Sequence, residues 1–359
     1  MTATTAVMPR PGVRWPFRVG NTLVHPVFDY LVIGGGLSVL VTAYLAWGRR
    51  FSPEAAAGAL GAYQLHLPLV VLIVNSAHFA ASTVRLYTKP RAREEHRFLT
   101  AGLPLVTLLA LFLAVLLAAP LGRHVFALYM TWSPFHYSAQ AYGLAMLYCY
   151  RSGASPTDDD RRLLRTACLV PFLRAFLDSP GAGVEWFAPA WMLDLPAAAA
   201  LRQGLVAVLS ALTFAVPVIW IAGLVRRQAP RVPFISLLVV LSNGLWFVVL
   251  RYIDAFAVAT VFHGLQYLAV VTVFHVKDHP RGGWLAQTAG FYAACLGLGY
   301  LLFNAWPYAF VGMGFGLAES MLLVVAAINI HHFIVDAYIW RLRKGSNARI
   351  AAAPILEAS

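Results

Sequence analysis

Charged residues are scarce in this chain: only 12% of its 359 residues are Asp, Glu, Lys or Arg, against roughly 25% in ordinary soluble domains. Hydrophobic residues make up 60% of the sequence. Several apolar runs are about 20 residues long, which is enough to cross a hydrocarbon core of roughly 30 Å. The composition excludes an ordinary soluble protein and predicts an all-α, polytopic integral membrane protein.

Cysteine is rare as well: three residues lie at scattered positions, with no CxxC pair. Neither a disulfide framework nor a thiolate metal site is therefore indicated. The sequence also lacks an HExxH zinc-protease motif, a GxSxG elbow, a P-loop, a usable GxGxxG fingerprint and a CxxCH haem attachment. These absences exclude enzymes with a local catalytic motif, so any site has to be assembled from several separate segments.

Acidic residues are few, with 15 Asp and Glu against 27 Lys and Arg, and the net charge is +12. Such an excess is compatible with nucleic-acid binding, but here the basic residues lie in short segments between the apolar runs. Membrane topology explains this distribution better. We therefore expect no nucleic-acid partner.

The apolar runs predict ten membrane-spanning helices, at 28–48, 56–84, 98–120, 124–150, 163–179, 203–225, 233–254, 256–275, 285–304 and 314–340. The fifth is short and charged, and residues 185–201 could instead re-enter from the far side. With ten spans the Lys/Arg clusters fall on one side, so the positive-inside rule places both termini in the cytoplasm. We expect a cytoplasmic segment at 1–27, a transmembrane domain at 28–342 and a cytoplasmic tail at 343–359, in a bacterial-type inner membrane. The Asp158–Arg162 run is predicted to be a solvated connection on the cytoplasmic face, with a headgroup or partner contact as the alternative.

A polar seam occupies the end of the last apolar run. Asn329, His332 and Asp336 are spaced i, i+3, i+7 and share one helix face, while His331 points about 100° away. Ionisable groups inside a bilayer are rare, and they usually face the bundle interior, where they pair or bind something. The seam is therefore expected to form half of a site.

Three other spans carry histidines at a comparable depth: His78, His136 and His263. With His332, these residues lie 7 to 15 positions before the Lys/Arg residues that follow their spans, or roughly 10–22 Å along a helix. The four spans run in the same direction, so their side chains can converge on one bundle site. Neutral imidazole binds zinc, copper and iron. We predict a transition-metal site whose ligands come from these four histidines together with His331 and Asp336.

Polar neighbours of the histidines are predicted to orient the imidazole rings: Asn75, Gln140, Gln266 and Asn329. Two residues are predicted to be catalytic, Tyr267 as a proton or electron donor and Asp336 as a base or ligand. For any single histidine, the alternative is a hydrogen-bonded core residue.

The His275-x-x-x-His279 spacing and the His331-His332 doublet resemble the histidine boxes of integral-membrane iron desaturases and hydroxylases. The resemblance covers these two short pieces, and the further HxxHH box of that family has no counterpart here. It implies an iron-dependent oxidation with an electron donor as partner. An unrelated membrane metalloenzyme stays open as the alternative.

The leading hypothesis is a non-haem iron oxidoreductase that acts on a lipid-soluble substrate such as an acyl chain, an isoprenoid or a quinone. Zinc with a hydrolytic water is the alternative metal chemistry. A bis-histidine haem protein for electron transfer also stays open. So does an ion- or proton-coupled transporter, which the intramembrane residues Arg251 and Asp254 would favour. The lipid bilayer is the expected partner in every case.

Overall fold

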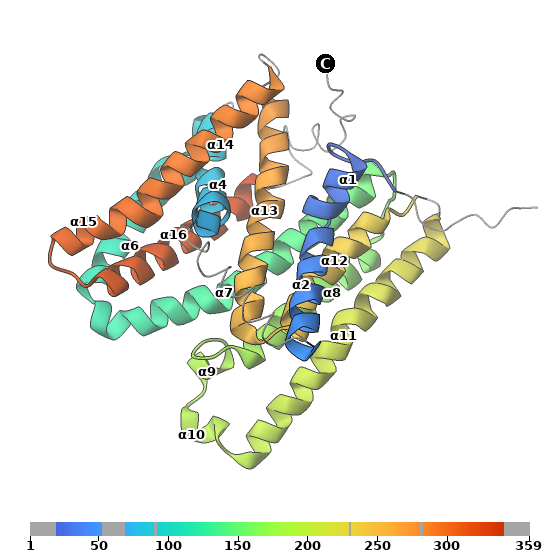
Figure 1. Cartoon of the computed structure of the whole chain (residues 1–359), viewed down its shortest axis with the longest axis horizontal. Coiled ribbons are helices and arrows are strands. Elements are labelled where there is room, and N and C mark those ends of the chain that lie inside the picture. The colour runs from blue at the N-terminus through green and yellow to red at the C-terminus, as the bar shows by residue number, and fades with distance from the viewer. Residues whose placement is uncertain (1–18, 52–68, 90–91, 230, 280–282, 341–359) are drawn as a thin grey trace, which may run out of the picture.

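The computed structural model describes residues 19–51, 69–89, 92–229, 231–279 and 283–340, and within these ranges it is all-helical, without strands (Figure 1). The first elements are α1 (Pro26–Phe28), η1 (Asp29–Ile33), α2 (Gly36–Phe51), η2 (Val71–Ser76), α4 (Ala77–Thr88), α5 (Ala92–Glu95), η3 (Phe98–Gly102), α6 (Leu103–Leu116) and α7 (Ala118–Arg151). The others are α8 (Asp158–Asp178), α9 (Val184–Phe187), α10 (Ala190–Leu193), α11 (Pro196–Gln228), α12 (Phe234–Val249), α13 (Tyr252–Asp278), α14 (Trp284–Tyr300), η4 (Leu301–Ala305), α15 (Trp306–Gly312) and α16 (Leu317–Ile339). The η elements are short π-helical turns. The prediction of an all-α fold is confirmed.

Among the described residues, five helical segments are long and apolar enough to cross a membrane: Phe98–Leu116, Pro196–Gln228, Tyr252–Asp278, Trp284–Gly312 and Leu317–Ile339. The bent pair Pro26–Ile33 and Gly36–Gly48 makes a sixth if it is counted as one span. The apolar helix α12 is shorter than these. These lengths and compositions indicate a membrane protein, whereas the prediction of ten spans is not confirmed. Much of the predicted span 56–84 lies outside the described residues.

The bend in the first apolar segment has a backbone cause. Gly35 separates η1 from α2 with φ +83°, a left-handed conformation that glycine adopts without strain. The two helical pieces meet there at 49°. A Cβ atom at Gly35 would lie 2.3 Å from Oγ of Ser242 on α12. Glycine therefore permits both the bend and the close approach of α12.

The long helices cross the molecule in different directions around α13. Figure 1 shows α11 along one edge and α14 with α15 along the opposite edge, while α13 stands between them. Helix α11 packs on α8, α14 packs on α4, and α16 packs on both α6 and α7. Helices α4, α7, α13 and α16 thereby enclose the interior that holds the histidines.

The Asp158–Arg162 run belongs to a helix rather than to a loop, because α8 begins at Asp158. Thr157 and Asp160 form a reciprocal cap: Thr157 Oγ1 accepts from the Asp160 N–H at 3.2 Å, and the Asp160 carboxylate accepts from the Thr157 N–H at 2.9 Å. This arrangement satisfies donors that a helix start leaves free. Asp160 also pairs with Arg227 at the end of α11. The start of α8 and the end of α11 therefore lie together.

Arg85, the first residue after the predicted span 56–84, is buried. Its side chain is 1% exposed and pairs with Asp278, at the end of α13, over 3.0 Å. The guanidinium carbon lies 5.3 Å from the centre of the Trp340 ring. A buried charge is retained when it is paired. This pair holds the ends of α4 and α13 together.

The buried carboxylate of Asp29 organises the segment before α2. Its oxygens accept from the backbone N–H groups of Leu23, Val24 and His25 at 2.5, 3.1 and 3.2 Å, and from the Tyr148 hydroxyl at 2.8 Å. Asp29→Asn keeps the size of the side chain but replaces one accepting oxygen with an NH₂ group. That group would face N–H or O–H donors and could not accept from them. We expect the substitution to lower the free energy of unfolding by about 3 kcal/mol, measured by thermal unfolding in detergent.

The matched control is Asp159→Asn. The Asp159 side chain is 92% exposed and pairs only at the surface with Arg162, over 3.5 Å, and exposed pairs contribute little. An equal loss of stability in the two variants would show that Asp29 has no special structural role.

Candidate metal centre

Four histidines from four helices meet in the interior: His78 of α4, His136 of α7, His263 of α13 and His332 of α16. All four are buried, and one ring nitrogen of each lies within 4.8 Å of those of the other three. The Nε2 atoms of His332 and His136 are 3.2 Å apart, close to the roughly 3.3 Å between two nitrogens on a tetrahedral ion with bonds near 2.0 Å. The structure therefore brings together the four histidines that were predicted from the sequence to lie at a comparable depth.

Several nitrogens in this cluster have no protein partner among the described residues. These are both ring nitrogens of His78 and Nε2 of His263. A buried polar atom left unpaired costs about 1–3 kcal/mol, so such atoms are rare unless another group satisfies them. Imidazole nitrogens that face one another without protein partners suit metal ligation. The cluster can hold a metal ion.

Helix α7 is adapted beside His136. Pro134 lies inside the helix and has no N–H, so the Met130 carbonyl four residues earlier loses its usual donor. The Tyr252 hydroxyl donates to that carbonyl at 3.4 Å. A residue in the first turn of α13 thus supplies the hydrogen bond that the Met130 carbonyl of α7 lacks because of Pro134.

Helices α4 and α13 approach closely at the cluster because Gly264, next to His263, has no side chain. A Cβ atom there would lie 3.1 Å from Cγ1 of Val74 and 3.4 Å from the Cβ of His78. A larger residue would push α4 away and separate the two histidines. The wide turn η2 ends at Ser76, just before His78, and such turns occur frequently at functional sites.

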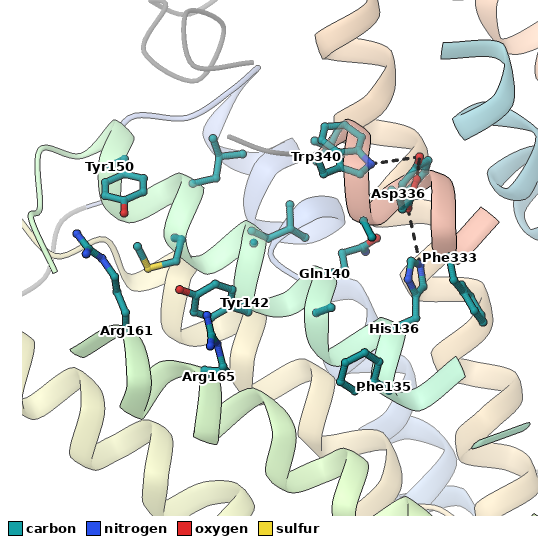
Figure 2. Close-up of a pocket in the computed structure, with 18 of the residues that line it drawn as sticks. Phe135, His136, Gln140, Tyr142, Tyr150, Arg161, Arg165, Phe333, Asp336 and Trp340 are labelled. Atoms are coloured by element: carbon teal, nitrogen blue, oxygen red, sulfur yellow. Dashed lines mark hydrogen bonds and ion pairs between the residues drawn. The ribbon is translucent and has the colours of Figure 1, made fainter. Parts of the chain in front are cut away.

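Asp336 lies beside two of the histidines. Its Oδ2 is 3.4 Å from Nε2 of His332 and 3.8 Å from Nε2 of His136, and Figure 2 shows His136 pointing toward it. The Tyr267 hydroxyl donates to Oδ1 of Asp336 at 2.7 Å, and Trp340 Nε1 donates to the Tyr267 oxygen at 3.3 Å. The two residues predicted to be catalytic therefore form one buried hydrogen-bonded chain that leads from the histidines.

His331 and the His275–His279 pair lie outside the metal-capable group. Nδ1 of His331 contacts Oγ1 of Thr107 on α6 at 2.9 Å, because adjacent helical residues point about 100° apart. The ring nitrogens of His279 contact backbone carbonyl oxygens of His275 at 2.8 Å and Thr88 at 3.0 Å. The histidine pairs that carried the family resemblance thus contribute only His332 to the cluster.

The amides predicted to orient the rings bond elsewhere or have no partner. Three donate to backbone carbonyls, Gln140 to His263 at 3.2 Å, Gln266 to Ile33 at 3.0 Å and Asn329 to Val325 at 2.6 Å. The Asn75 side-chain oxygen is buried without a partner among the described residues. Each amide shares a helix face with a cluster histidine but lies about one turn, or 5.4 Å, from it along the helix axis. Because of this distance, the three amides that donate reach backbone carbonyls rather than an imidazole ring.

Sequence reasoning missed Ser82, whose Oγ lies 2.9 Å from Nδ1 of His332. Its position one turn after His78 on the same helix face was the available signal.

Ser82→Ala is expected to lower metal affinity about tenfold, because the ring of His332 loses the contact that orients it. Competition with a chelator measures this change. Ser320→Ala is the control, since the Ser320 hydroxyl donates to the carbonyl of Gly316, one turn earlier at the start of α16, at 2.7 Å. Equal losses in the two variants would contradict the role of Ser82.

A cavity of about 890 Å³ reaches the cluster (Figure 2). His136, Tyr267 and Asp336 line it at one end, and Arg161 and Arg165 of α8 line it elsewhere. This volume is within the roughly 300–1,000 Å³ of small-molecule sites. The candidate metal centre is therefore adjacent to space for an organic molecule.

Fold and site together define an all-helical protein with helices of membrane-spanning length and four buried histidines that can bind a metal ion. No protein-family model, curated protein or solved structure matches this chain. Its function is therefore inferred from the chemistry of the site.

Proposed function

We propose that the chain is a membrane-embedded metal-dependent oxidoreductase that uses non-haem iron and acts on a lipid-soluble substrate. One observation carries the proposal: four buried histidines from four different helices each place one ring nitrogen within 4.8 Å of those of the other three. Such a site cannot arise from one locally folded segment. It requires that the whole bundle be arranged around it, which favours a functional role over that of a single core histidine.

Iron is the preferred metal because a carboxylate lies beside the histidines. Iron sites that activate oxygen combine imidazole with carboxylate and keep positions open. Asp336, at 3.4 Å from His332, is placed to supply that carboxylate. Zinc with a hydrolytic water is the alternative, since histidine ligands suit zinc as well.

The packing of the rings disfavours haem. His136 lies with its ring centre 4.9 Å from that of His263 and 5.0 Å from that of His332. His78 lies 4.5 Å from His332 and 4.8 Å from His263. The ring centres of His78 and His136 are 6.5 Å apart. These close ring pairs leave no flat slot for a macrocycle between them. A compact ion fits this arrangement better.

The protein's own side chains would transfer protons and let the substrate reach the site. Bound iron would supply oxygen activation, with electrons from a separate donor as partner. The Tyr267 hydroxyl donates to Oδ1 of Asp336 at 2.7 Å, so this pair could pass a proton to or from a reacting group. The cavity reaches His136 and Asp336, which gives the substrate a path to the site.

The proposed orientation places both termini in the cytoplasm of a bacterial-type inner membrane, with ten spans. Contacts between segments that were predicted to share the cytoplasmic side support this orientation. Arg151 at the end of α7 donates to the Thr22 carbonyl at 2.6 Å, and Arg227 at the end of α11 pairs with Asp160. Cysteines introduced at Arg14 and Lys344 are expected to resist an impermeant label in intact cells. The three native cysteines are buried and should give little background. Labelling at either site in intact cells would overturn the topology.

Elemental analysis tests the proposed function directly. Protein purified in detergent without chelator should contain about one iron per chain and show no haem absorption band. About one zinc per chain would transfer the proposal to hydrolytic chemistry. Folded protein with no more than trace transition metal, and no metal uptake on titration, would overturn the metalloenzyme.

A further inference from the structure

The cavity follows one face of α7 from the histidine cluster to the start of α8. Its lining on α7 includes Trp132, His136, Gly143, Leu147 and Tyr150, spaced by three, four or seven residues as on a single helix face. From His136 to Tyr150 the helix rises about 21 Å. The cavity therefore has the length for an extended chain rather than for a compact solute.

The walls of this passage are mainly hydrocarbon. Leu144, Leu147, Val270 and Phe274 line it between the two ends, and Phe333 lines it beside His136. Gly143 adds space, since a Cβ atom at this position would meet no atom within 4 Å. An apolar chain fits such a lining, whereas a polar chain would lose its hydration there.

The other end of the cavity is positively charged and open to the surface. Arg161, Arg162 and Arg165 line it with one carboxylate, Asp158, which pairs with Arg161 over 2.5 Å. Arg161 Nε is nevertheless buried without a partner among the described residues. The Arg165 guanidinium carbon lies 5.4 Å from the ring centre of Tyr142, and Figure 2 shows both residues between Arg161 and His136. The Arg162 side chain is 81% exposed, so this end meets solvent.

The geometry points to a substrate class: a single-chain lipid with an anionic head group, held by Arg161 and Arg165, whose apolar chain extends along α7 to the metal centre at His136. Arginine binds carboxylate and phosphate groups through paired donors, so either head group matches this end. Arg161 and Arg162 pair with Asp158 and Asp159, whereas Arg165 pairs with no carboxylate among the described residues. An uncharged isoprenoid or quinone would leave Arg165 without a counterion. This inference rests on the proposed function, because it names the substrate of that site.

Binding of defined lipids tests the inference. The protein, reconstituted in phosphatidylcholine nanodiscs, is titrated with labelled oleate, oleoyl lysophosphatidate, oleyl alcohol and octanoate. We expect oleate or oleoyl lysophosphatidate to bind at least about tenfold more tightly than oleyl alcohol, since a charge-assisted contact contributes that much. Octanoate should bind weakly because its chain is short. The tighter of the two anionic lipids identifies the head group as carboxylate or phosphate.

Two variants locate the lipid within the cavity. Arg165→Gln should weaken binding of the anionic lipid about tenfold and leave oleyl alcohol unchanged. Gly143→Leu should weaken both, because the added side chain fills the passage. The controls are Arg226→Gln, at an exposed arginine near the end of α11, and Gly122→Leu, at a position on α7 where a Cβ atom also meets no atom within 4 Å. Neither control lies along the cavity.

The results separate this inference from the proposed function. Equal affinity for oleate, oleoyl lysophosphatidate and oleyl alcohol, or unchanged anionic-lipid binding in Arg165→Gln and Gly143→Leu, overturns the substrate class even when the protein contains metal. Selective binding that both variants weaken supports the substrate class even when elemental analysis finds no metal, in which case only the proposed chemistry fails.

Discussion

Replacing His78 with leucine is expected to abolish metal binding while leaving the metal-free protein at least as stable as the wild type. Loss of a group that only orients a ligand costs about 10–100-fold in metal affinity, so loss of a ligand should cost at least about 100-fold. Both nitrogens of His78 are buried without a protein partner among the described residues. Leucine has a similar size and removes two unsatisfied polar atoms, which otherwise cost about 1–3 kcal/mol each. Metal titration and thermal unfolding of chelator-treated protein measure the two effects.

His331→Leu is the matched control on the same helix as His332. His331 bonds to Thr107 at 2.9 Å and lies outside the cluster, so this change should leave metal affinity unaltered. A core histidine at position 78 would behave in the opposite way: its replacement would destabilise the chelator-treated protein and leave the metal content unchanged. That result would remove His78 from the site.

Changing Asp336 to asparagine is expected to lower metal occupancy or turnover by at least about tenfold. The substitution keeps the volume of the side chain but removes a negative charge 3.4 Å from Nε2 of His332 and 3.8 Å from Nε2 of His136. It also weakens the acceptor for the Tyr267 hydroxyl. Metal content and turnover are compared with wild type in protein of equal expression and equal thermal midpoint.

Asp254→Asn serves as the control for this change. Asp254 lies in the first turn of α13, whereas Tyr267 lies more than three turns further along that helix. Metal content should therefore be unaffected by Asp254→Asn. If Asp336→Asn matched wild type in both metal content and turnover, Asp336 would be a structural residue and would leave the site.

The four histidines that meet in the structure could be grouped from the sequence, because distance along a helix depends on helical rise alone. A residue seven positions from a helix end is about 10 Å from it in any straight α-helix, so His78 and His332 were expected at similar depth without knowledge of their neighbours. Which helices adjoin cannot be derived in this way. Arg85 illustrates the limit, since it directly follows the predicted span 56–84 and is nevertheless buried against Asp278.

The sequence by itself determined the all-helical fold and the membrane character, because composition and the length of apolar runs decide whether a chain can satisfy its backbone within a bilayer. It also grouped the four histidines by their distance along the chain from the Lys/Arg residues that follow their spans. The tertiary structure decided that His332 rather than His331 joins the cluster, that Ser82 contacts a ring where the amides do not, and that a cavity connects His136 to Arg165. These features depend on how each helix is rotated about its axis and which helix packs beside it. That is a property of side-chain packing between distant segments, and no local pattern in one sequence specifies it.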